Sequence, residues 1–256
     1  MRKGIIDIHA HVLPGVDDGA RDMEEACSLL GAAAAQGVTG VIATPHYSGK
    51  ERLEELQKTA ETLQGAVRKI YPDFCVYVGM ENYGHEELPE RLKEGRALTL
   101  AGSRYVLVEY STGAAYRTII EGMRKLSFGG YEPVLAHMER YQCLRDEKKL
   151  SDLAGSGYWL QMNYESLEGA WFSRETRWCR RQVEQGRIAL LGTDMHRLDW
   201  RAPRLEGALK WLEGHVSQRY LEDMIWNNPL KILGGEEELW NHPARPLGSR
   251  KSGNEK

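Results

Sequence analysis

The sequence contains seven short apolar runs, most of them continuous rather than alternating with polar residues. Continuous runs are typical of strands buried on both faces, as in a parallel sheet or barrel. Helical patterns separate the runs, so the chain alternates between strand and helix and predicts one α/β domain, either a barrel or a doubly wound sheet. The predicted strands are 5–8, 41–43, 75–78, 105–108, 133–136, 159–162 and 188–191.

Two of the predicted helices have clear signals. In residues 21–37, apolar residues recur at helical spacing, Asp22 and Glu25 resemble a capping box, and Gly37 supplies the stop. Residues 51–70 carry a second apolar stripe. We expect one domain over residues 1–240 and a flexible tail over 241–256, which is polar and rich in Pro, Gly and basic residues. Further helices are expected at about 116–126, 174–185, 204–214 and 217–226.

Composition excludes several classes of protein. The 256 residues are 41% hydrophobic with a net charge of −3, an ordinary globular balance without the basic stripe that nucleic-acid binding requires. No apolar run approaches the roughly 18–20 residues of a membrane span, and the N-terminus lacks the pattern of a signal peptide. Four widely spaced cysteines without a CxxC pair predict a reduced, cytoplasmic protein.

Metal-capable side chains follow six of the seven predicted strands. A single His or Glu after a strand is usually structural. His9 and His11, however, are separated by a single residue and would point to the same side of their strand. The carboxyl ends of barrel strands share one rim, where such folds build their sites. Five of the eight histidines fall there. The candidate ligands are His9, His11, Asp18, His46, Glu81, Glu109, His137, Asp194 and His196.

Nine nitrogen and oxygen ligands without a thiolate suit two or three divalent ions, with Mn, Fe or Zn fitting better than a structural cysteine–zinc site. Three divalent ions would exceed the charge of the four carboxylates, which favours a dianionic ligand such as a phosphate monoester. Arg140 lies three residues after His137, and Arg201 lies five residues after His196. A guanidinium matches two phosphate oxygens at once, so both arginines are candidates for phosphate binding.

These residues carry a family resemblance over about residues 5–235. The chain resembles the PHP (polymerase and histidinol phosphatase) superfamily, and within it the bacterial manganese-dependent protein-tyrosine phosphatases of the CpsB/CapC type. The His-x-His motif is shared with amidohydrolases, whereas the VDDGA and HMERY segments are more specific. The motifs, in chain order, are DIHAHVLPGVDDGA, IATPH, LVEYS, AHMERY and GTDMH.

The resemblance implies a distorted TIM-like (β/α)7 barrel with a trinuclear centre held by all nine candidate ligands. Arg140 and Arg201 match its phosphate-contacting arginines. The implied reaction is hydrolysis of phosphotyrosine by a metal-bound hydroxide, with Mn²⁺ as cofactor and Fe, Zn, Co or Mg as alternatives. The implied substrate is the tyrosine-rich tail of a bacterial tyrosine kinase that controls capsule or exopolysaccharide synthesis. Residues 82–84 and Arg197 depart from the family pattern and leave the pocket shape open.

The sequence also leaves other functions open. A histidinol-phosphatase-like enzyme acting on a small phosphate monoester would use the same metal site, and an amidohydrolase would use a similar barrel. A non-enzymatic metal-binding protein would not need the two arginines. A cysteine-based phosphatase is excluded, because that mechanism needs an arginine six residues after the cysteine. The residues at that spacing are Ala33, Glu81, Lys149 and Gln185. The sequence leaves the oligomeric state undetermined.

Overall fold

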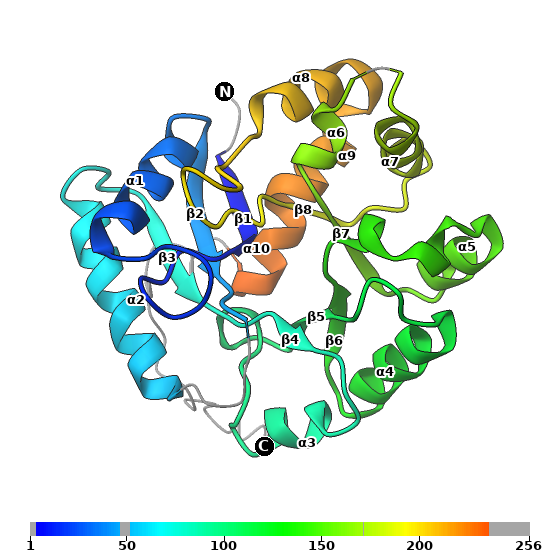
Figure 1. Cartoon of the computed structure of the whole chain (residues 1–256), viewed down its shortest axis with the longest axis horizontal. Coiled ribbons are helices and arrows are strands. Elements are labelled where there is room, and N and C mark those ends of the chain that lie inside the picture. The colour runs from blue at the N-terminus through cyan, green and yellow to red at the C-terminus, as the bar shows by residue number, and fades with distance from the viewer. Residues whose placement is uncertain (1–3, 47–51, 171, 236–256) are drawn as a thin grey trace, which may run out of the picture.

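The computed structural model describes residues 4–46, 52–170 and 172–235, and the eight strands in these ranges all pair in parallel. They form a ring with helices on its outside (Figure 1). This arrangement confirms the predicted barrel and rules out an open doubly wound sheet. The strands are β1 (Ile5–Ala10), β2 (Val38–Ala43), β3 (Cys75–Val78), β4 (Asn82–Tyr83), β5 (Tyr105–Glu109), β6 (Glu132–Leu135), β7 (Trp159–Asn163) and β8 (Leu190–Gly192).

The helices alternate with the strands along most of the chain. A π-helix, η4 (Asp223–Asn227), follows α9, and short 3₁₀ turns cover Leu100–Gly102, Met138–Arg140 and Gln142–Arg145. The α-helices are α1 (Met23–Ala34), α2 (Leu53–Arg68), α3 (Leu88–Lys93), α4 (Tyr116–Phe128), α5 (Glu147–Gly155), α6 (Glu165–Glu168), α7 (Arg174–Glu184), α8 (Glu206–His215), α9 (Gln218–Glu222) and α10 (Asn228–Leu233).

The strand predicted at 75–78 is confirmed as β3, and a second short strand, β4, follows it closely. Residues of β3 pair with β2, and after a break at 79–81 the chain pairs with β5 through the two-residue strand β4, which was not predicted. An isolated bridge between His46 and Glu81 continues the pairing across the break. The chain thus passes from one sheet to the other within this stretch, and Glu81 lies at the point of transfer.

The ring closes between β1 and the residues that follow β8. Ala10 forms an isolated parallel bridge with Met195, and the His11 N–H donates to the Met195 carbonyl oxygen at 2.8 Å. Asp7, which is fully buried in β1, accepts the Thr193 N–H at 3.0 Å and also its hydroxyl. Burial raises the pKa of Asp7 to about 6, although these hydrogen bonds oppose the shift.

The opposite end of the barrel is covered by the C-terminal helices. The Tyr220 hydroxyl donates to the Ile188 carbonyl oxygen at 2.8 Å, and the Asn228 side-chain amide donates to the Ala189 carbonyl oxygen at 2.9 Å. Both acceptors precede β8, so α9 and α10 lie at the amino ends of the strands (Figure 1). The carboxyl ends are left free for the candidate ligands.

The helix predictions are largely confirmed. Asp22 caps α1 by accepting the Glu25 N–H at 2.9 Å, but the Glu25 carboxylate accepts the N–H of Arg21 rather than that of Asp22, so the capping box is incomplete. The helix predicted at 217–226 is divided into α9 and η4. Helices α3, α5, α6 and α10 were not predicted. The expected tail at 241–256 lies outside the described residues, and the domain boundary stays a prediction.

No helix in the described ranges is long and apolar enough to cross a bilayer. The core is formed by strand residues together with the inward faces of the helices, and all six residues of β1 are buried.

The loop after β1 folds back tightly onto the strand end. The Ala20 N–H donates to the His11 carbonyl oxygen at 3.1 Å, and Gly19 lies directly against that carbonyl. A methyl group at Gly19 would lie 2.0 Å from the oxygen, closer than any van der Waals contact. Glycine at this position therefore allows the loop to carry Asp17 and Asp18 back to the rim.

We expect Gly19→Ala to lower the free energy of unfolding by about 1–3 kcal/mol, the usual scale of overpacking at a site that cannot relax. Gly65→Ala is the matched control, because a methyl group there, in the last turn of α2, meets nothing within 4 Å. That change should raise stability by roughly 0.5–1 kcal/mol through helix propensity. Urea unfolding of the two variants measures the difference, and equal effects would contradict the close approach of Gly19 to His11.

Candidate metal centre

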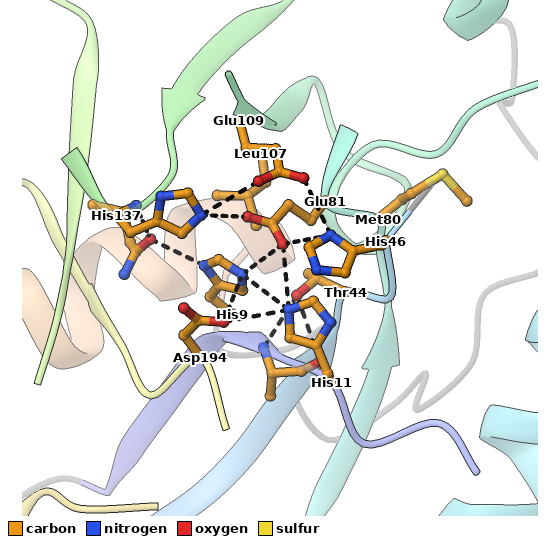
Figure 2. A network of polar contacts seen from close by, with 12 residues as sticks. His9, His11, Thr44, His46, Met80, Glu81, Leu107, Glu109, His137 and Asp194 are labelled. Carbon is orange, nitrogen blue, oxygen red and sulfur yellow. Dashed lines mark hydrogen bonds and ion pairs between the residues drawn. The ribbon is translucent and has the colours of Figure 1, made fainter. Parts of the chain in front are cut away.

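The nine candidate ligands lie at the carboxyl ends of the strands. Seven of them are gathered in the cluster of Figure 2. His9 belongs to β1, Glu109 ends β5, and Glu81 occupies the break between β3 and β4. The others follow strand ends directly or lie in the loop after β1: His11, Asp18, His46, His137, Asp194 and His196.

Glu81 is at the centre of this cluster. Its Oε2 atom lies 3.2 Å from His9 Nε2, 3.3 Å from His11 Nε2 and 3.1 Å from His46 Nδ1. Its Oε1 atom lies 2.7 Å from His137 Nε2. The carboxylate is almost fully buried, so it requires neighbouring positive charge. Imidazoles from β1 and from the segments after β1, β2 and β6 surround it (Figure 2).

Three groups of ligand atoms converge closely enough to hold an ion each, with all atoms of a group within 4.8 Å of one another. His137 belongs to none of the three, but its Nε2 atom lies 3.7 Å from Glu109 as well as beside Glu81. His11 and His46 each belong to two groups, so the groups adjoin. The groups are His9, His11 and Asp194; His11, Asp18, His46 and His196; and His46, Glu81 and Glu109.

Hydrogen bonds at the far side of the His9 and His11 rings determine which of their nitrogens are free. His9 Nδ1 lies 3.0 Å from Gln161 Oε1, and His11 Nδ1 lies 2.7 Å from Asp17 Oδ2. Both partners are acceptors, so Nδ1 carries the proton and Nε2 carries the lone pair in the neutral rings. The two Nε2 atoms lie only 3.3 Å apart and both face carboxylates. Such a convergence of electron pairs fits a bound cation.

Two arginines complete the rim at Asp194. Arg140 Nη2 lies 2.8 Å from Asp194 Oδ2, and Arg201 donates to the same oxygen. Arg201 Nη1 also lies 3.1 Å from His196 Nε2. Their side chains are 33% and 19% exposed, so both guanidiniums remain within reach of a ligand entering from solvent. The structure thus brings both predicted arginines to the predicted ligands.

The fold, the cluster and its arginines can be compared with known proteins. The family described as "Capsular polysaccharide synthesis, CpsB/CapC" matches residues 5–234. The chain belongs to the CpsB/CapC family. The predicted family is thereby confirmed.

Relatives within the CpsB/CapC family match most of the chain. "Tyrosine-protein phosphatase CpsB" of Streptococcus pneumoniae is 29% identical over 238 residues, covering 90% of this chain and 98% of its own. "Tyrosine-protein phosphatase YwqE" of Bacillus subtilis is 30% identical over 213 residues, covering 82% and 84%. A structure from a study of YwqE and CpsB as "unique metal-dependent tyrosine phosphatases" has a TM-score of 0.81, 28% identity, and coverage of 90% and 94%.

More distant structures share the fold of this CpsB/CapC member but not its sequence. The lactonase Lmo2620 of Listeria monocytogenes has a TM-score of 0.60 at 13% identity, covering 90% of this chain and 94% of its own. An amidohydrolase of Mycoplasma synoviae has a TM-score of 0.56, also at 13% identity, covering 88% and 86%. These similarities support the barrel alone, since one barrel serves many reactions.

The electrostatics of the cluster favour cation binding. Burial acts to lower the pKa of His9, but the Glu81 and Asp194 carboxylates outweigh it and raise the pKa above its usual value. Burial acts to raise the pKa of Asp194, but His9, His11 and Arg140 hold it well below its usual range. By contrast, burial together with His11 and Arg201 lowers the pKa of His196 to about 3, which keeps its ring neutral.

Several site residues have an unusual backbone. Among the described residues, four non-glycine residues have positive φ, and three of them are His137 at 30°, Asp194 at 53° and Arg201 at 61°. Such conformations are strained and persist only where the surroundings hold them. Two of them, His137 and Asp194, take this conformation where the chain turns just after β6 and β8.

Sequence reasoning missed the residues that support the ligands. Asp18 was predicted as a ligand, but its neighbour Asp17 was not assigned a role. Asp17 is hydrogen-bonded to the His11 ring and accepts the His46 N–H at 2.9 Å. Gln161 and Asn163 lie on β7, the strand without a predicted ligand, and both are buried. The signal was available in WLQMN, where two amides occupy alternate positions of a buried strand.

The cysteines take no part in this site. All four are free thiols, which agrees with the expected reduced state. Burial raises the pKa of Cys179 to about 12, so this thiol stays protonated and is a poor nucleophile.

We expect metal affinity to weaken as pH falls from about 8 to about 6, because protons and metal ions compete for the same imidazole nitrogens. Carboxylates raise the pKa values of His9, His11 and His46 against the opposing effect of burial, so these rings bind protons more readily than a free imidazole. The affinity should fall roughly tenfold per pH unit for each proton displaced. Calorimetry of Mn²⁺ binding in buffers of different ionisation enthalpy measures the number of protons released per bound ion. A Kd that does not change with pH, without proton release, would contradict the assignment of these histidines as metal ligands.

Proposed function

We propose that this chain is a metal-dependent protein-tyrosine phosphatase. The observation that carries the proposal is the convergence, on one barrel rim, of the predicted His and carboxylate ligands with two guanidiniums. Cations bound by those ligands, together with the arginines, form a strongly positive site suited to a phosphate dianion. Relatives whose sequences match nearly the whole chain are named tyrosine-protein phosphatases, which supports phosphotyrosine as the group that enters.

We assign all nine predicted ligands to the centre and propose three divalent ions, with Mn²⁺ as the native metal. The three adjoining groups of ligand atoms support this number, and His137 would join through its position between Glu81 and Glu109. The structure from the study of YwqE and CpsB, which matches 90% of this chain, is described as that of a metal-dependent tyrosine phosphatase, which supports a metal requirement. Bound ions of this kind activate water as a nucleophile and stabilise charge on the attacking and leaving oxygens.

The protein's own residues then position the phosphoryl group. Arg140 and Arg201 share one oxygen of Asp194, so the carboxylate holds two guanidiniums side by side at the edge of the cluster. Each can exchange this contact for phosphoryl oxygens when substrate enters. Donors aimed at these oxygens stabilise the charge that grows in the transition state. We therefore assign both arginines as catalytic residues.

The proposed partner is a phosphotyrosine protein, namely the tyrosine-rich tail of a bacterial tyrosine kinase. The family description, capsular polysaccharide synthesis, supports a role in that process. A cytoplasmic location stays a prediction, supported by the four free cysteines.

Arg140→Ala should lower kcat/KM on every phosphate monoester by roughly 2–4 kcal/mol of transition-state stabilisation, about 30- to 1,000-fold. Its metal content should not change, because a guanidinium has no lone pair for a cation. His137→Ala should lose metal as well as activity. Arg104→Ala is the control, since that arginine is exposed and pairs with Glu132, the first residue of β6, at the end of the strand away from the rim. Kinetics with elemental analysis tests all three, and metal loss in Arg140→Ala would refute the assigned role.

Metal-free protein prepared with a chelator should be inactive, and added Mn²⁺ should restore activity. The restored enzyme should show a much higher kcat/KM on phosphotyrosine peptides than on phosphoserine peptides or histidinol phosphate. A phenyl ring carries the phosphate deeper into the rim, and phenolate, with a pKa of about 10, leaves more readily than an alkoxide. The measurement is kcat/KM for the three substrates at equal Mn²⁺. Preference for histidinol phosphate would favour the small-substrate phosphatase instead, and full activity without metal would refute both.

A further inference from the structure

The strand that carries no predicted ligand contributes two buried amides to the metal centre. Gln161 and Asn163 lie two residues apart on β7, so both side chains point to the same face of the strand. The side chains of both residues are buried. They are hydrogen-bonded to each other, since Gln161 Nε2 donates to Asn163 Oδ1 at 2.9 Å. Buried amides are kept in a barrel interior only where their hydrogen bonds are satisfied.

The orientation of the Gln161 amide is determined by its partners. Its Oε1 atom accepts the backbone N–H of His137 at 2.7 Å, and a backbone N–H can only donate, so this atom must be the oxygen. The same oxygen lies 3.0 Å from His9 Nδ1, which must therefore be the protonated nitrogen of that ring. His9 Nε2 is then left with its lone pair facing Glu81 and Asp194.

The hydrogen bonds continue through Asn163 to a third ligand. Asn163 Nδ2 donates to Asp194 Oδ2 at 2.8 Å, and Glu139 Oε1 accepts the backbone N–H of Asn163 at 3.0 Å. Both amide nitrogens, Gln161 Nε2 and Asn163 Nδ2, thus donate to an acceptor. A methyl group at Gly192, on the neighbouring strand β8, would lie 3.0 Å from Gln161 Nε2 and 2.8 Å from the Cβ atom of His9. Glycine there leaves room for the two side chains to meet.

We infer that Gln161 is a positioning residue that sets the tautomer of His9 and, through Asn163, the placement of Asp194, so that β7 organises ligands from β1, β6 and β8. This inference rests on the metal centre proposed above. Without the Gln161 amide, the His9 ring can rotate or exchange its tautomer, the His137 N–H loses its acceptor, and Asn163 loses its donor. Supporting residues of this kind typically contribute 10- to 100-fold to metal affinity.

The test uses Gln161→Met, which keeps the side-chain length but removes both hydrogen-bonding groups. Gln64→Met is the matched control: Gln64 is also buried, and it donates to the Phe74 carbonyl oxygen at 2.8 Å and accepts the Val76 N–H at 2.6 Å, away from the rim. Gln161→Glu restores an acceptor toward His9 and His137. The full-length chain is titrated with Mn²⁺ by calorimetry, and urea unfolding reports the stability of each variant.

A second readout follows the His9 ring itself. In the Zn²⁺-loaded, ¹⁵N-histidine-labelled protein, the Nδ1–H proton of His9 should give a protected imidazole resonance. We expect Gln161→Met to lose this resonance and to bind Mn²⁺ about 10- to 100-fold more weakly. Gln64→Met should keep the resonance and bind within about threefold of the parent, even where both variants lose similar stability. Gln161→Glu should recover the resonance and part of the affinity.

Three outcomes would overturn the inference: parental Mn²⁺ affinity in Gln161→Met with the resonance intact, equal weakening in Gln64→Met, or no recovery in Gln161→Glu. These results are separable from failure of the proposed function. A parent protein that binds no divalent metal would refute the metal centre and this inference together. A parent that binds metal but does not hydrolyse phosphotyrosine would refute the proposed activity and leave the role of Gln161 standing.

Discussion

The buried carboxylate of Glu81 is the constraint on which the rest of the structure depends. It lies where the chain leaves β3 for β4, and it contacts imidazoles from β1 and from the segments after β2 and β6. An anion removed from water is stable only with compensating charge and hydrogen bonds. Side chains at the carboxyl ends of the parallel strands supply that charge, because these ends all reach the same rim. Positive charge at this rim therefore stabilises the buried Glu81 carboxylate and also serves the proposed chemistry.

The strands of the barrel contribute different kinds of residue to the candidate centre. Most carry ligands, whereas β7 supplies the amides that hold those ligands in place. Asp17 does the same for His11 and the backbone of His46 from the loop after β1. The distant structural relatives have the same barrel at 13% identity, so the barrel alone does not determine a reaction. The ligands, their supports and the arginine pair on Asp194 distinguish this chain.

Much of the fold and most of the candidate ligands could be predicted because their signals are local. Buried strands appear as continuous apolar runs. A ligand at the end of a strand is adjacent to that strand in the sequence, as Glu109 is the last residue of β5. The elements that were missed lack such signals. Strand β4 has two residues, too few for any periodicity, and the helix predicted at 217–226 gives no indication of the π-helical turn in it. Arg140 was placed by its motif, but its contact with Asp194 joins segments 54 residues apart.

By itself, the sequence determined the alternation of strand and helix, the seven main strands, and the identity of the side chains at their carboxyl ends, since all of these depend on neighbours along the chain. The tertiary structure decided what depends on neighbours in space: the closure of the ring between Ala10 and Met195, the transfer between sheets at Glu81, and the acceptors that orient the imidazoles of β1 and of the loop after it. A histidine in a sequence has two equivalent nitrogens for a metal. Only the packing of Gln161 against His9, 152 residues away, makes them different.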